Sequence, residues 1–86
     1  MKFTVTKFFA EKVYNNNIID RAEVGITVVN NGTISAIRYD ELIKEAIKIF
    51  GRPEKMTYYR LVTEDGRRST FHGYKASDAL TLVSFV

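Results

Sequence analysis

Apolar and polar residues alternate at the start of the chain, from Lys2 to Thr6, which places Phe3 and Val5 on one face and predicts a first β-strand. The next run, residues 7–14, fits two structures. Phe9 and Val13 are four positions apart, as on one face of a helix, whereas the aromatic and β-branched content also suits a strand. We predict a short helix for residues 7–14, with a strand as the alternative.

Residues 24–39 carry the clearest hairpin pattern, because two β-rich runs flank Asn30-Asn31-Gly32 and both Asn and Gly tolerate positive φ. A three-residue loop gives the opposed pairs Val29:Thr33, Val28:Ile34, Ile26:Ala36 and Val24:Arg38. Opposed residues share a face, so this register collects Val24, Ile26, Val28, Ile34 and Ala36 on one core side. A two-residue loop would mix that set. We therefore predict the three-residue loop.

After the hairpin, the apolar residues no longer alternate but recur at helical spacing, which predicts a helix over residues 41–50. Asp40 is the expected N-cap, and Gly51 and Pro53 end the run. The apolar positions at helical spacing are Leu42, Ile43, Ala46, Ile47 and Phe50. The other face carries Glu41, Lys44, Glu45 and Lys48, a solvated surface of mixed sign.

Three further elements complete the predicted fold. Residues 56–63 and 67–74 form a second hairpin about Glu64-Asp65-Gly66, residues 80–86 form a strand, and Ser77 with Asp78 caps one helical turn or shapes a loop. The prediction is a single α+β domain spanning residues 1–86. It is a two-layer sandwich: a mostly antiparallel five- or six-stranded sheet with one principal helix, about 41–50, packed on one face.

Composition narrows the chemistry of this domain of 86 residues. It is 45% hydrophobic and 27% charged, as in an ordinary globular domain, and has no cysteine for a disulfide, a thiolate nucleophile or a zinc site. Its one histidine, His72, has no recognisable catalytic surroundings. We therefore expect no enzyme activity, no cofactor and no metal. We also expect a cytoplasmic protein, because a secreted domain this small would normally carry disulfides. We expect no membrane partner, because no apolar run is long enough to span a bilayer.

The net charge of +3 is unevenly distributed. Residues 1–42 hold five bases and five acids, whereas residues 43–86 hold eight bases and five acids, so an anionic partner would bind the second half. With a three-residue loop, the second hairpin turns Tyr59, Leu61, Ser69 and Phe71 toward the core. Its opposite face then carries Tyr58, Arg60, Val62, Arg68, Thr70 and His72.

Two candidate surfaces follow. The face with Tyr58, Arg60, Arg68, Thr70 and His72 interleaves aromatic and basic groups, as single-stranded nucleic-acid binders do; an ordinary amphipathic sheet face is the alternative. The first hairpin's other face is uncharged and carries Thr27, Val29, Thr33, Ser35 and Ile37. It is covered within the chain or, if open, by a partner protein or a second copy in a homodimer.

The leading hypothesis is a small non-enzymatic interaction module that binds a protein partner. Such a module would be a regulator, inhibitor or assembly component, of the kind that phages and mobile elements encode. Nucleic-acid binding through the second half is the alternative.

Overall fold

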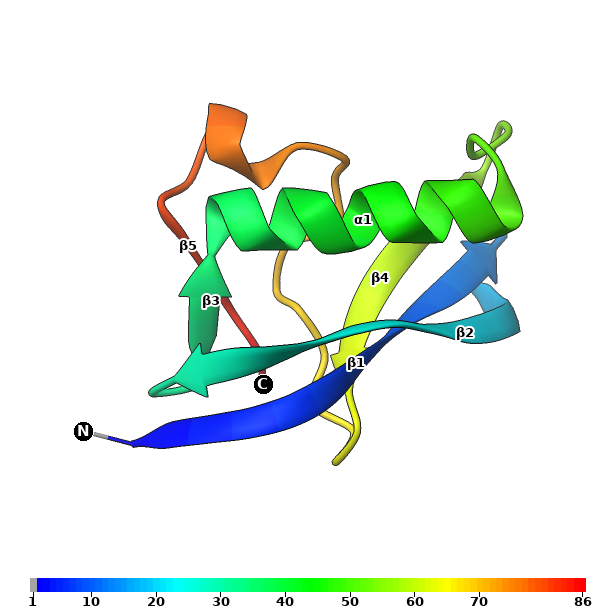
Figure 1. The fold of residues 1–86 in the computed structure, drawn as a ribbon. Coiled ribbons are helices and arrows are strands. Elements are labelled where there is room, and N and C mark those ends of the chain that lie inside the picture. The colour runs from blue at the N-terminus through cyan, green and yellow to red at the C-terminus, as the bar shows by residue number, and fades with distance from the viewer. Residues whose placement is uncertain (1) are drawn as a thin grey trace.

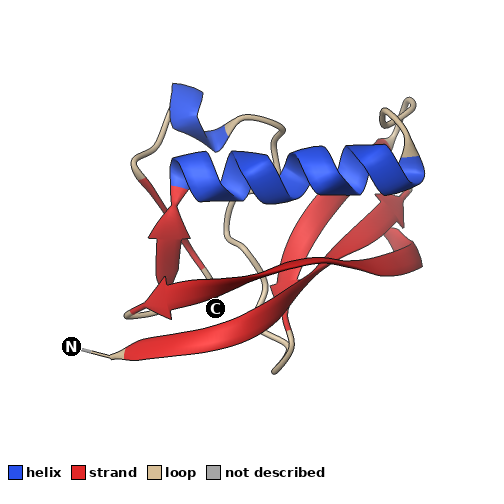
Figure 2. Ribbon diagram, in the orientation of Figure 1, coloured by secondary structure: helices blue, strands red, loops and turns tan. Residues whose placement is uncertain are grey.

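The computed structural model describes residues 2–86 and shows an antiparallel five-stranded curled sheet with one helix packed against it, as predicted (Figure 1). The sheet order is β4-β1-β2-β3-β5. The strands are β1 (Phe3–Tyr14), β2 (Asn17–Asn30), β3 (Thr33–Ser35), β4 (Thr57–Thr63) and β5 (Leu82–Ser84). The helix α1 (Ala36–Phe50) lies across the sheet, and one 3-10 turn, η1 (Ala76–Asp78), lies near its start (Figure 2).

Residues 7–14 are strand, so the helix predicted there was wrong. This segment belongs to β1, and it pairs with β2 on one side and with β4 on the other. Pairing along both edges outweighs a local helical spacing of two apolar residues. Asn15 and Asn16, with φ of 48° and 66°, form the turn into β2, which therefore begins at Asn17.

The loop of the first predicted hairpin has two residues, not three. Asn30 pairs with Thr33, and Asn31 and Gly32 adopt φ of 53° and 77° between them. β3 ends at Ser35, and the chain then enters α1, so the predicted pairs from Val29:Thr33 to Val24:Arg38 do not form. The slip of one residue reverses the faces of β2 near the turn: Val29 is buried, whereas Ile26 and Val28 are exposed. The rest of the predicted core side is correct, since Ile34 and Ala36 are buried and Val24 packs partly buried against the core.

Helix α1 starts earlier than predicted, at Ala36, because Ser35 caps it. The Ser35 hydroxyl accepts a hydrogen bond from the Arg38 N–H at 3.1 Å. Asp40, the predicted N-cap, lies inside the helix and is buried. The C-terminal end is as predicted: Gly51, with φ of 86°, follows the last helical residue, Phe50.

The second hairpin forms only near its turn. Thr63 N donates to Arg67 O at 2.8 Å and Val62 bridges Arg68, which matches the three-residue register. Residues 67–74 do not continue as a strand. Instead Ser69 bridges Phe85, and Arg68 exchanges two main-chain hydrogen bonds with Val86. Since β4 and β5 are the outer strands of the sheet, residues 68–70 join its two edges and close the curl into a ring.

The core fills the inside of this ring. Phe8 of β1 packs edge-on against Phe85, with ring centroids 5.1 Å apart, and α1 covers the core with Tyr39, Leu42 and Ile43. The core side predicted for the second hairpin is correct: Tyr59, Leu61 and Ser69 are buried, and Phe71 packs partly buried against the same cluster. No helix within residues 2–86 has the length and apolarity to cross a membrane.

Candidate interaction surfaces

Glu11 organises the outer face of the sheet, opposite α1. It lies directly across from Arg60 in the β1–β4 register and is only 5% exposed. Arg60 Nε reaches Glu11 Oε1 at 3.3 Å, and Arg68 binds both carboxylate oxygens, at 3.0 and 3.2 Å. The pKa of Glu11 is lowered: burial alone would raise it, but the hydrogen bonds and charges of Arg68 and Arg60 outweigh that effect. The cluster therefore carries one net positive charge.

The predicted basic and aromatic face is assembled around this carboxylate. Arg60 and Arg68 meet at Glu11, and the ring of Tyr58 packs on that of His72 with centroids 4.8 Å apart. Thr70 lies in the closing segment, where its N–H donates to Ser84 O at 2.9 Å.

The sequence reasoning missed Glu11 because it assigned residues 7–14 to a helix. The signal for it was the alternation of Phe9, Glu11 and Val13, which puts the carboxylate on one strand face with two apolar neighbours.

The other predicted face, Thr27, Val29, Thr33, Ser35 and Ile37, is not brought together as one open surface. Thr27 accepts a hydrogen bond from Arg38 of α1 at 3.2 Å, and Val29 is buried. Thr33 binds the Asn30 carbonyl in the turn, Ser35 caps the helix, and Ile37 is exposed on α1 itself. The two-residue turn is the physical reason, since it reverses which β2 residues face outward.

The same reversal exposes Ile26 and Val28, which were predicted to lie in the core, beside two apolar residues of β1. Val5 lies opposite Val28 in the β1–β2 register, and Phe3 and Ile26 lie two positions away on the same face. The exposed fractions are 59% for Phe3, 68% for Val5, 54% for Ile26 and 50% for Val28. We call these four residues the hairpin strip. In other proteins, contiguous exposed apolar patches are typical of interaction surfaces.

An unpaired strand edge borders the hairpin strip. β4 pairs with β1 only from Phe8 onward, so over residues 3–6 no strand within residues 2–86 occupies that side of β1. Asn31 N donates to Lys2 O at 2.8 Å, so the main-chain groups of Lys2 point toward β2. In an antiparallel pair, successive residues alternate between pointing their main-chain groups toward the neighbouring strand and away from it. The N–H and C=O groups of Phe3 and Val5 therefore point away from β2 and are available to another strand.

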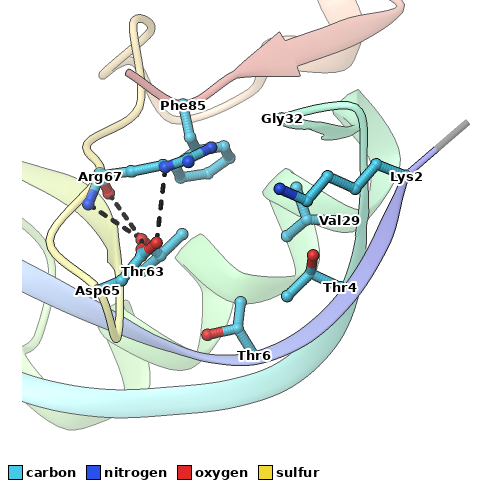
Figure 3. A pocket seen from close by; sticks show the side chains of 9 residues that line it. All are labelled: Lys2, Thr4, Thr6, Val29, Gly32, Thr63, Asp65, Arg67 and Phe85. Carbon is cyan, nitrogen blue, oxygen red and sulfur yellow. Dashed lines mark hydrogen bonds and ion pairs between the residues drawn. The ribbon is translucent and has the colours of Figure 1, made fainter.

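A cavity of about 370 Å³ opens beside this edge (Figure 3). Thr4 and Thr6 of β1 form one wall, Val29 and Phe85 supply apolar surface, and Arg67 lies across from Lys2. Asp65 forms an ion pair with Arg67 at 3.5 Å. No group of three His, Asp or Glu side chains within residues 2–86 is placed to hold a metal ion.

Comparisons of the chain with protein-family models, with curated proteins and with solved structures give no match. The function is therefore inferred from the geometry of these surfaces. Two of them present free recognition groups: the hairpin strip with its unpaired edge, and the outer face around Tyr58 and His72.

Proposed function

We propose that this protein is a small non-enzymatic interaction module that binds a protein partner by adding a strand to the free edge of β1. The observation that carries the proposal is the hairpin strip lying directly beside unpaired main-chain groups at Phe3 and Val5. In strand addition, main-chain hydrogen bonds supply affinity and the flanking apolar side chains supply buried area. A regulator or an assembly component would act through such a surface.

The occupant that this edge fits is a second copy of the chain. Antiparallel pairing of identical strands is two-fold symmetric, so the surface complements itself. A two-fold axis at Thr4 sets Phe3 opposite Val5 of the second copy, and both residues have main-chain groups that point outward. Lys2 then faces Thr6 of the second copy, so no like charges meet. The two hairpin strips become one continuous apolar face.

Sedimentation velocity over a range of protein concentrations tests this pairing. We expect a dimer, and we expect Val5→Pro to give a monomer, because proline removes an N–H that points away from β2 and leaves the β2 ladder intact. Val5→Thr keeps that N–H and should weaken the dimer less. Ile37→Thr, at an apolar residue equally exposed on α1, is the matched control and should leave the mass unchanged. A monomer at every concentration, or a dimer that persists in Val5→Pro, refutes the pairing.

Nucleic-acid binding is the second candidate, favoured by the packing of Tyr58 on His72 beside Arg60 and Arg68. One observation argues against nucleic-acid binding: the guanidinium groups of Arg60 and Arg68 already donate hydrogen bonds to Glu11. Binding to single-stranded DNA and RNA at two salt concentrations tests it, because phosphate contacts must appear at low salt. Tyr58→Ala and His72→Ala are better probes than the arginine variants, which would leave the buried Glu11 without its partners.

A further inference from the structure

A second binding surface lies on the other side of the molecule, in a groove of about 650 Å³ between α1 and residues 74–77. We propose that this groove docks an acidic segment of a partner protein, with apolar side chains in the groove and carboxylates at its rim. The site goes beyond the hairpin strip, shares no residue with it, and is testable independently of it.

Apolar side chains from both walls line the groove between its charged groups: Ile37, Ile43, Ile47 and Tyr74. One stripe of α1, at helical spacing from Ile37 to Lys48, forms one wall, with Ile43 and Ile47 at its base. Tyr74 lies on the opposite wall and is half exposed. Apolar walls of this kind accept aliphatic side chains spaced along a helix or an extended segment.

The rim of the groove is basic. Four cations line it, and of these Lys44 and Arg52 form no ion pair with any residue in the described range 2–86. The four are Lys44, Lys48, Arg52 and Lys75. Lys48 meets Glu45 at 3.2 Å and Lys75 meets Asp78 at 3.9 Å, in exposed pairs that are weak and that a ligand carboxylate can replace.

The two acids that line the groove are already engaged. Glu41 binds Arg38 at 2.9 Å, and Asp40 accepts hydrogen bonds from Ala76 and Ser77. The groove therefore presents a net positive rim to a ligand. Charge complementarity favours an acidic partner and would steer its approach.

Hydrogen bonds between α1 and residues 71–77 hold the groove in shape. Asp40 ties residues 76 and 77 to α1, and the Tyr39 hydroxyl donates to the carbonyls of Gly73 at 2.9 Å and Phe71 at 3.3 Å. A preformed groove loses little conformational entropy when a ligand binds, which favours affinity.

An acidic peptide suits these walls better than a nucleic acid does. The groove offers one aromatic ring, Tyr74, for stacking, and its remaining uncharged lining is mainly isoleucine. Bases need several stacking platforms along a strand, whereas leucine or isoleucine side chains need only the apolar floor.

The experiment uses fluorescence anisotropy with a short labelled peptide that carries leucines at helical spacing and glutamates elsewhere. We expect binding that weakens as salt rises. A peptide with Gln in place of Glu, and one with Ser in place of Leu, should each bind at least roughly ten-fold less tightly, a loss of about 1.4 kcal/mol. No binding of the acidic peptide at low salt overturns the proposal, and so does tighter binding of oligodeoxythymidine than of the peptide.

Matched charge-reversal variants locate the site. Lys44→Glu with Arg52→Glu should weaken peptide binding at least roughly ten-fold. Arg21→Glu with Lys55→Glu makes the same change in net charge at two exposed residues that do not line the groove, and it should have little effect. Equal weakening by both pairs would show non-specific attraction and refute the site. Val5→Pro should bind the peptide normally, so failure of the strand-addition proposal would leave this result intact.

Discussion

Asp40 of α1 accepts a hydrogen bond at 2.7 Å from the main-chain N–H of Ala76, a residue 36 positions further along the chain. Its second carboxylate oxygen accepts from the Ser77 N–H at 3.3 Å and from the Ser77 hydroxyl. One buried carboxylate thus satisfies the start of η1 and fixes one wall of the groove. The contact explains why an acid lies inside the helix at a buried position.

Replacing this carboxylate should destabilise the protein. We expect Asp40→Ala to lower the free energy of unfolding by about 1–3 kcal/mol, because it leaves buried N–H groups without an acceptor. Asp40→Asn retains one oxygen and should cost less. Urea unfolding measures both. Asp78→Ala, at an exposed acid in the same turn, is the control and should stay within about 0.5 kcal/mol of the wild type; an equal loss there would contradict the assignment.

The Glu11 cluster should make stability depend on acidic pH. Because its pKa in the folded state is lowered from 4.5, Glu11 contributes stability that is present above pH 4.5 and is lost as the pH falls through the lower folded value. Glu11→Gln should cost about 1–3 kcal/mol near neutral pH. The difference from the wild type should shrink on acidification, as denaturant unfolding at a series of pH values would show.

Glu45→Gln is the control for that experiment, because Glu45 is exposed and pairs only with Lys48. Its stability profile should follow that of the wild type. A Glu11→Gln deficit that stays constant down to strongly acidic pH would argue against the ionised cluster.

Tyr39 should make stability fall at alkaline pH. Burial, and then the charge of Asp40, raise the pKa of its hydroxyl above 10 in the folded state. A raised pKa contributes stability that is present below pH 10 and is lost as the pH rises beyond it. Tyr39→Phe should cost about 1 kcal/mol at neutral pH, through the lost hydrogen bonds, and should reduce the alkaline loss. Tyr14→Phe, at an exposed tyrosine, should do neither; thermal unfolding across this pH range decides.

The turn at Asn31-Gly32 should be sensitive at its second position. Gly32 has φ of 77°, which an L side chain adopts with strain, so Gly32→Ala should lower the free energy of unfolding by about 1 kcal/mol. Asn31→Gly, at φ of 53°, should change it by only a few tenths. Equal effects at both positions in urea unfolding would contradict the observed turn geometry.

Local signals predicted much of the fold. The turns at Asn31-Gly32 and Glu64-Asp65-Gly66, the apolar stripe of α1 and the inward side of β4 all depend on residues close in sequence, and all are present. The grouping of Tyr58 and Arg60 on the outer face of β4 follows from the parity of a single strand.

What the sequence reasoning missed depends on contacts between distant segments. Residues 7–14 are strand because β4, some fifty positions away, pairs with them. A one-residue difference in loop length moved Ile26 and Val28 from the core to the surface, and nothing local distinguishes the two registers. The groove beside α1 exists only because Asp40 and Tyr39 form hydrogen bonds with residues 71–77. Such contacts between distant residues produce no periodic pattern of apolar residues in the sequence.

The join between residues 68–70 and the C-terminal strand also sets the order of folding events. The β1–β2 hairpin and α1 need contacts between near neighbours and can form early, whereas the ring closes only when β4, residues 68–70 and Phe85 all meet. Phe85→Leu should therefore accelerate unfolding and leave the folding rate almost unchanged in stopped-flow measurements; slower folding would place closure before the barrier. The hairpin strip and the edge of β1 are exposed both before and after this closure, so self-association through them can compete with completion of the sheet during folding.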